Sequence, residues 1–221
     1  MYIEFPYEFI IQGDFMDIME ALIKKYNYNE PIILKDVKID GISDENIRQI
    51  LSRLVKSGQI ERYDQGVYYI PKVTPLGKSR IPAKKVYEKK FISDRKNTFG
   101  FYTGLILQNA IGLTTQVPNT IEIITNREKS RRREINVGNQ KLRLRRSRTK
   151  VTSRNVKALQ LLELMNSIDM KQLTNIEKKA LITYVRSQNI SKNDIIPYIP
   201  DFPAKASKNL IESGVINELT H

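Results

Sequence analysis

Residues 44–71 constrain the fold more than any other part of the chain, because a helical pattern is followed directly by a hairpin pattern. Apolar residues recur there at the spacing of one helix face: Ile47, Ile50, Leu51, Leu54 and Val55. Ser43 is a good residue for capping the start of this helix, and Gly58 is the expected stop. We therefore expect a helix over residues 44–57.

The second half of the segment predicts a two-stranded β-hairpin. Residues 59–63 and 67–70 are rich in the β-branched and aromatic side chains that strands favour. The loop between them ends in Gly66, where a short hairpin needs a positive φ. A helix followed by a hairpin is typical of a winged helix-turn-helix, which usually presents a helix to a DNA groove. An apolar stripe over residues 14–26 and a short segment after Pro31 would supply the two preceding helices.

The side of the predicted helix opposite its apolar stripe is polar and mostly basic. It carries Arg48, Gln49, Ser52, Arg53 and Lys56. Arginine and glutamine can make paired hydrogen bonds to guanine and adenine edges, whereas serine and lysine suit phosphate or base contacts. Arg62 in the hairpin is expected to touch the DNA backbone. The same face could instead be an ordinary solvated surface, but the hairpin that follows favours DNA binding.

Charge is distributed unevenly along the chain, which has 221 residues and a net charge of +13. Residues 1–72 hold 9 basic and 12 acidic side chains, whereas residues 73–221 hold 28 basic and 12 acidic ones. We predict a winged-helix domain over residues 1–72, a linker rich in proline and glycine over 73–82, and a basic domain over 83–221. The excess charge of the second domain indicates that it also meets a polyanion.

The most basic window is residues 127–154, with 12 basic and 2 acidic side chains. Two strands are expected inside it, over residues 133–137 and 141–146. Leu142 and Leu144 alternate with cations, so one strand face would pack on a core and the other would present a row of positive charge. The predicted phosphate-binding residues are Arg131, Arg132, Arg133, Arg143, Arg145 and Arg148. A solvated charged surface is the alternative, and charge alone does not decide between DNA, RNA and an acidic protein.

The remaining pattern completes a mixed second domain. Residues 100–113 form an apolar segment that we expect to be a buried helix, and residues 120–125 form a strand candidate. From residue 153 onward the pattern is helical, and Thr174 with Glu177 three residues later predicts a capping box. The predicted fold class is α+β, with an N-terminal winged helix-turn-helix and a C-terminal α/β domain that combines a small sheet with terminal helices.

The sequence carries no recognisable catalytic set. It has no cysteine, and its single histidine is the last residue, His221. Glu122 and Glu134 lie on neighbouring strand candidates, but no third acid completes a familiar metal-dependent nuclease site. We expect no enzyme activity, no metal and no cofactor. The chain has no run of eighteen apolar residues, so we expect a cytoplasmic protein without a membrane partner.

Two stretches resemble the AbiEi-type antitoxins of type IV toxin–antitoxin and phage abortive-infection systems. They are GVYYIPK at 66–72, followed by the Thr/Gly/Pro linker, and GLTTQVPNTIEIIT at 112–125, followed by a short basic hairpin. The resemblance spans roughly residues 10–165. By position, the family's recognition helix falls on residues 44–57 and its wing on residues 59–70.

The resemblance implies a repressor that binds inverted repeats in double-stranded DNA at its own promoter. It also implies that the C-terminal domain neutralises a cognate nucleotidyltransferase toxin, without requiring a stable complex. The alternative is a winged-helix module that binds protein or RNA and reads no operator, and the acidic balance of residues 1–72 keeps this alternative open.

Overall fold

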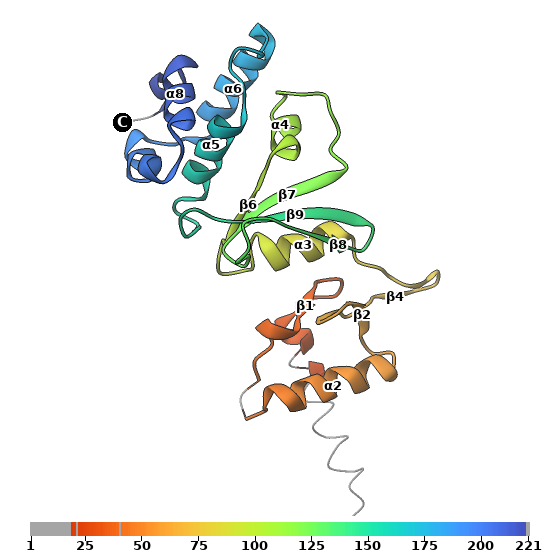
Figure 1. Cartoon of the computed structure of the whole chain (residues 1–221). Coiled ribbons are helices and arrows are strands. Elements are labelled where there is room, and N and C mark those ends of the chain that lie inside the picture. The colour runs from red at the N-terminus through yellow and green to blue at the C-terminus, as the bar shows by residue number, and fades with distance from the viewer. Residues whose placement is uncertain (1–18, 21, 40, 220–221) are drawn as a thin grey trace, which may run out of the picture. The chain divides into compact units, whose positions relative to one another are not determined.

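The computed structural model describes residues 19–20, 22–39 and 41–219, and the chain divides into two compact units, Met1–Val86 and Tyr87–His221 (Figure 1). Residues 19–20 and 22–25 are helical, as the apolar stripe predicts. The part of that predicted helix before residue 19 lies outside the described residues.

The helix and hairpin predicted in the first unit are confirmed. Helix α2 spans Asp44–Lys56, and the Ser43 hydroxyl accepts a hydrogen bond from the backbone N–H of Asn46 at 3.2 Å. Strands β2 (Glu61–Asp64) and β3 (Val67–Tyr69) pair in antiparallel fashion. Gly58 ends the helix with a φ of +74°, a left-handed conformation in which glycine meets no Cβ penalty.

A third short strand, β1 (Ile32–Ile33), pairs antiparallel with β3 and gives the strand order β1-β3-β2. The helix expected after Pro31 is only one 3₁₀ turn, η1 (Leu34–Asp36). The physical reason is that the two isoleucines are used in strand pairing, so few residues remain for a helix before the extended Val37. The buried side chains beneath this sheet include Leu22, Ile32, Leu51, Leu54 and Ile60.

The segment expected to be a linker folds as a small hairpin. Strand β4 (Val73–Thr74) pairs with β5 (Gly77–Lys78). The ammonium group of Lys78 bonds to a Glu61 carboxylate oxygen at 2.7 Å and to the Gly58 carbonyl at 2.8 Å. Proline and glycine therefore make a turn here, and the hairpin belongs to the first unit. Helix α3 (Ala83–Phe91) follows it.

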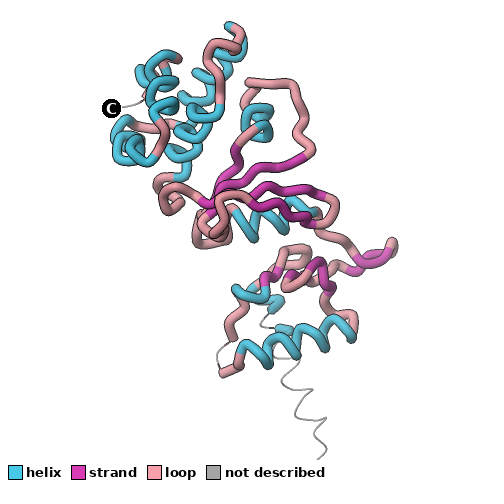
Figure 2. Tube along the Cα trace, viewed as in Figure 1, coloured by secondary structure: helices cyan, strands magenta, loops and turns pink. Residues whose placement is uncertain are grey.

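The second unit is built on a four-stranded sheet with the order β6-β7-β9-β8. Its strands are β6 (Gly100–Thr103), β7 (Thr120–Thr125), β8 (Arg133–Val137) and β9 (Gln140–Arg146). Strands β7 and β9 are parallel, and the other neighbours are antiparallel. Figure 2 shows these strands as one layer with helices on both sides.

One expectation in this unit is wrong, because residues 100–113 are not a single helix. They form strand β6 and then a short helix, α4 (Leu105–Ala110). Gly104 separates the two with a φ of +66°, which interrupts a right-handed helix. The aromatic residues before it pair with β7, and periodicity alone does not separate a short apolar strand from a helix.

The two faces of the sheet are covered differently. The Tyr102 hydroxyl donates to a Glu88 carboxylate oxygen of α3 at 2.7 Å, so α3 lies on the Tyr102 face. On the opposite face, Phe101 packs with Leu159 of α5 (Val156–Ser167). Fully buried leucines on β9, Leu142 and Leu144, confirm the alternation predicted for that strand.

The C-terminal part of the second unit is helical, as predicted. After α5 come α6 (Asn175–Gln188), α7 (Lys192–Ile195), η2 (Ile196–Asp201), α8 (Ala204–Glu212) and η3 (Val215–Asn217). The capping box of Thr174 and Glu177 is confirmed, with hydrogen bonds in both directions. The fold is therefore of the mixed α and β class. Within the described ranges, no helix has the length and apolar character needed to cross a membrane.

Candidate nucleic-acid interface

The polar face of α2 is the first candidate surface. Its basic and polar residues are all exposed: Arg48, Gln49, Ser52, Arg53 and Lys56. The opposite face buries Ile47, Leu51 and Leu54, so packing fixes which side of the helix turns outward. Arg62 is exposed on β2, with its Nε 3.5 Å from the Asp64 carbonyl oxygen. The first unit thus presents all six predicted residues to solvent.

An acidic residue, Glu45, also belongs to this face. It is exposed, and it lies three and four positions before Arg48 and Gln49, which places the three side chains side by side on α2. Glu45 is not among the residues predicted for this face, although its helical spacing from Arg48 and Gln49 is sufficient to place it there. A carboxylate here can accept a hydrogen bond from cytosine N4, and it repels backbone phosphate.

A second acidic residue, Asp44, lies at the start of α2 and forms an ion pair with Lys38. Lys38 donates to an Asp44 carboxylate oxygen at 2.6 Å, and this hydrogen bond and charge lower the pKa of Asp44. Asp44 is therefore negatively charged at neutral pH and favourable for the positive end of the helix dipole. The N-terminal turn of α2 is consequently acidic, whereas its later turns carry cations.

The predicted row of cations on β9 is largely neutralised by neighbouring acids. The Arg143 guanidinium contacts carboxylate oxygens of Glu122 and Glu134, both at 2.9 Å, and Lys141 reaches Glu134 at 2.8 Å. Strand register explains the pairing, because Glu122 and Glu134 are the direct partners of Arg143 on β7 and β8. The expected face of uncompensated charge is therefore absent at Arg143.

The pKa shifts agree with this pairing. Hydrogen bonds from Lys141 and then Arg143 lower the pKa of Glu134 to about 2. The hydrogen bond to Glu134 correspondingly raises the pKa of Arg143. Glu134 and Arg143 are therefore charged at neutral pH and paired with each other.

Further predicted cations are paired with buried acids. Arg145 contacts a carboxylate oxygen of Glu163 on α5 at 2.5 Å, and Arg148 lies 3.9 Å from the same carboxylate. Arg133 contacts Glu128 at 2.9 Å.

The last two predicted arginines differ in how closely they are paired. Arg132 lies 3.7 Å from Glu134. Of the six arginines predicted in the second unit, Arg131 alone has no ion-pair partner among the residues that the structure describes.

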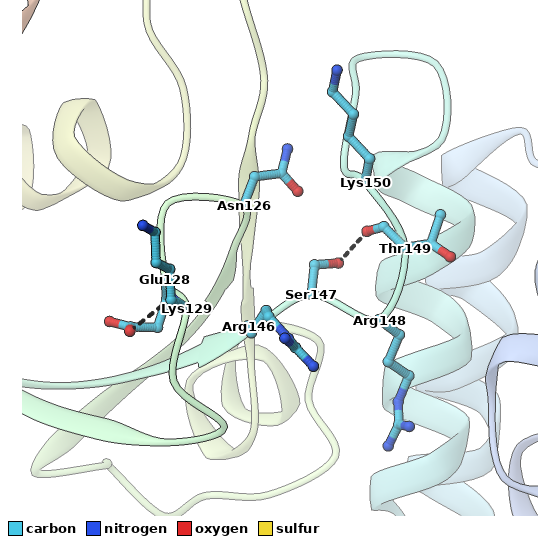
Figure 3. A pocket seen from close by; sticks show the side chains of 8 residues that line it. All are labelled: Asn126, Glu128, Lys129, Arg146, Ser147, Arg148, Thr149 and Lys150. Carbon is cyan, nitrogen blue, oxygen red and sulfur yellow. Dashed lines mark hydrogen bonds between the residues drawn. The ribbon is translucent and has the colours of Figure 1, made fainter.

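Three cations that were not singled out from the sequence lie beside this region. Lys129, Arg146 and Lys150 are exposed and, within the described part of the chain, have no ion-pair partner. They line an open cavity of about 520 Å³ (Figure 3). Arg146 is the last residue of β9 and is exposed there.

The cationic side chains at the end of β9 and in the segment that follows it, residues 146–150, point in two directions. Figure 3 shows the side chains of Arg146 and Arg148 pointing to the same side, whereas Lys150 points away from them. Between them, the Ser147 hydroxyl donates to the Thr149 carbonyl oxygen at 2.5 Å, which tightens the turn. Arg146 and Arg148 also line a second cavity, next to α5.

The fold and its two surfaces define a class of chain with a helix-and-hairpin unit and a basic α/β unit. A family model described as "Family of unknown function (DUF6088)" matches residues 18–193, and the chain belongs to this family. No curated protein matches the chain. In the ranges that the structure covers, no group of three or more acidic or histidine side chains could hold a metal ion.

Proposed function

We propose that this protein is a DNA-binding transcriptional repressor that also acts as an antitoxin. In this proposal the first unit is a winged helix-turn-helix, in which α2 is the recognition helix and the β2-β3 hairpin is the wing. The observation that carries it is the exposed polar face of α2, held outward by a buried apolar stripe and followed directly by the hairpin.

The dimensions of α2 suit a DNA groove. A helix of 13 residues is about 20 Å long, and the major groove of B-DNA is about 12 Å wide. Arg48 and Gln49 lie in the N-terminal half of α2, the part of a recognition helix that contacts base edges. Arg53 and Lys56 lie nearer its end and suit phosphates. Sequence preference would therefore come mainly from Arg48 and Gln49.

The second unit would add affinity that does not depend on sequence. Arg131 and Arg146 are the best candidates for phosphate contacts, because both lack a counter-charge within the described residues. Arg143 is a weaker candidate, since a phosphate would have to compete with two carboxylates. In this division of roles, the acidic first unit determines which DNA sequence is bound. The basic second unit contributes much of the electrostatic affinity for DNA.

The antitoxin role rests on the resemblance to AbiEi-type proteins at residues 66–72 and 112–125. By this proposal the protein is cytoplasmic, represses its own promoter at inverted repeats, and counters a cognate nucleotidyltransferase toxin. Neutralisation requires no stable complex with the toxin, and the proposal requires no catalytic group, metal or cofactor.

Footprinting on the DNA upstream of the protein's own operon tests the repressor role. We expect protection of an inverted repeat, and loss of that protection in the Arg48→Ala variant. Lys208→Ala is a matched control, since it removes an exposed cation from α8 in the second unit. Absence of protection by the wild-type protein would refute the repressor role. The antitoxin role predicts a nucleotidyltransferase gene in the same operon, and co-expression of this protein should relieve the growth arrest that the nucleotidyltransferase causes. Persistent growth arrest would contradict the antitoxin role.

An interaction module that binds protein or RNA is the second candidate. It is favoured by the net charge of −3 over residues 1–72 and by Glu45 on the polar face of α2. This candidate predicts no footprint on the operon's DNA, together with crosslinking of the wild-type protein to RNA or to a protein partner. A footprint that depends on Arg48 would exclude it.

A further inference from the structure

Five arginines line a cavity of about 560 Å³ in the second unit. They are Arg131, Arg132, Arg145, Arg146 and Arg148. The cavity lies at the end of β9, where the strand and the chain after it face α5. Its size falls within the range of small-molecule sites, about 300–1,000 Å³. Neither the proposed reading of duplex DNA nor toxin neutralisation requires a pocket of this kind.

The charge of the lining is strongly unbalanced. Glu163 is its only carboxylate, and it is 3% exposed and already contacts Arg145 at 2.5 Å. Five guanidinium groups face one carboxylate on the lining, and Arg132 also lies 3.7 Å from Glu134 outside it, so a formal surplus of three positive charges remains. Clustered cations next to low-dielectric walls repel one another, and an anionic ligand relieves that repulsion. The cavity is therefore suited to an anion.

Arg145 is one of the lining arginines, and an ion pair holds its guanidinium group in place. The buried carboxylate of Glu163 fixes one end of its guanidinium group. Its Nε is buried and finds no hydrogen-bond acceptor in the part of the chain that the structure describes. Buried donors in proteins almost always have a partner, so a small turn of the guanidinium group that brings Nε to a ligand oxygen would be favourable. Guanidinium groups bind phosphate oxygens, often through two parallel hydrogen bonds.

The other wall of the cavity is apolar and aromatic. Phe101, Leu159 and Phe202 line it, and the Arg148 guanidinium carbon lies 5.5 Å from the Phe202 ring centroid. The Phe202 ring lies beside the arginines of the lining. The cavity therefore suits a ligand with a planar group at one end and a negative charge at the other. Nucleic-acid bases stack on aromatic side chains in many single-strand binding proteins, with an affinity of about 1–3 kcal/mol per base.

We propose that this cavity binds one nucleotide unit, with its phosphate on Arg131, Arg145 and Arg146 and its base against Phe202. The unit is either a free nucleoside phosphate or an unpaired nucleotide of a single strand, because a base stacked inside a duplex cannot enter a pocket. This binding goes beyond the proposed reading of duplex DNA and does not depend on α2.

Calorimetric titration of the full-length protein tests the proposal. The ligands are a nucleoside monophosphate, a short single-stranded oligonucleotide with a 5′-phosphate, a blunt duplex and inorganic phosphate. Binding of the free nucleotide identifies a free ligand, and binding of the oligonucleotide alone identifies an unpaired strand. Arg146→Gln should weaken either ligand about tenfold, which corresponds to about 1.4 kcal/mol. Arg154→Gln is the matched control, because Arg154 is exposed and lies outside the cavity lining.

Phe202 separates a nucleotide from a simple anion. Phe202→Leu should weaken nucleotide binding about tenfold and leave inorganic phosphate unchanged, whereas Phe202→Tyr, which keeps the ring, should bind normally. Phe202 packs against the core, so thermal unfolding of the leucine variant is measured, and the exposed Arg131→Gln provides a second variant. Equal losses for Arg146→Gln and Arg154→Gln would overturn the proposal. Unchanged nucleotide binding by Phe202→Leu would also overturn it. The same holds if the wild-type protein binds neither the nucleoside monophosphate nor the oligonucleotide.

The outcome is separable from that of the repressor proposal. Arg48→Ala should bind the nucleotide like the wild type, because Arg48 lies in the first unit and outside the cavity. Loss of the operator footprint with intact nucleotide binding would contradict only the repressor role.

Discussion

The ion pairs on β9 predict that two arginines of the same basic window act differently on DNA. Arg146 has no ion-pair partner among the described residues, whereas Arg143 contacts two carboxylates at 2.9 Å. Arg146→Ala should weaken binding to a random-sequence duplex and flatten its salt dependence. Arg143→Ala should change the salt dependence much less and should instead lower the free energy of unfolding.

The expected magnitudes follow from the contacts. Each neutralised phosphate contributes a slope of about −0.9 to the plot of log affinity against log salt, or about 3.5-fold in affinity between roughly 50 and 200 mM salt. Arg146→Ala should remove about one such contribution. Arg143 would first have to leave charge-assisted hydrogen bonds that are each worth about 1.5–3 kcal/mol. Its removal leaves Glu122, which is 24% exposed, without a partner, so we expect about 1–2 kcal/mol of destabilisation after solvent screening.

Fluorescence polarisation over a salt series measures the slopes, and urea unfolding measures the stabilities. Arg186→Ala is the matched control, since Arg186 is also paired, with Glu218 at 2.5 Å, but lies on α6. This control should leave the slope unchanged. If Arg143→Ala flattened the salt dependence as much as Arg146→Ala and kept its stability, the reasoning from ion pairs would be refuted.

Three further predictions concern single residues. Glu45→Gln should raise affinity for random DNA about threefold in gel-shift titrations, because the charge lost is one that repels phosphate; unchanged affinity would place Glu45 away from the DNA. Gly100→Ala should lower the free energy of unfolding by about 3 kcal/mol, since a Cβ would lie 2.1 Å from a backbone oxygen, and a normal melting temperature would contradict this. Because the pKa of Glu134 is lowered from 4.5 to about 2, its contribution is complete above about pH 4.5 and is lost as the pH falls towards 2. The urea-unfolding difference between wild type and Glu134→Gln should therefore be largest at neutral pH and shrink through this window, and a difference independent of pH would exclude the pairing.

The sequence predicts the first unit well because its signals are local. The cap at Ser43, the apolar spacing along α2 and the glycines that end the helix and the hairpin loop are all read within a few residues. Strand β1 does not follow from the sequence, because two residues carry no periodicity. The proline and glycine of residues 73–82 predict a linker and not the β4-β5 hairpin, since they mark a turn without showing which strands flank it.

The second unit was harder to predict because its decisive contacts are not local. Glu122 and Glu163 lie outside the basic window of residues 127–154, yet they reach Arg143 and Arg145 from β7 and α5. The parallel pairing of β7 with β9 that brings Glu122 beside Arg143 follows from no short pattern. The cavity next to α5 likewise depends on Phe202, which lies far along the chain from β9.

The claim that α2 reads DNA sequence is tested most directly by the ratio of two affinities, one for the operon's upstream DNA and one for random DNA. This ratio is measured for the wild type and for the Arg48→Ala, Gln49→Ala double variant. A reading helix predicts a wild-type ratio of about a thousand or more. Each lost pair of base contacts should cost about 1–3 kcal/mol of discrimination and so lower that ratio, while the affinity for random DNA changes little. A wild-type ratio near one, or a high ratio that the double variant retains, would contradict the claim that α2 reads DNA sequence.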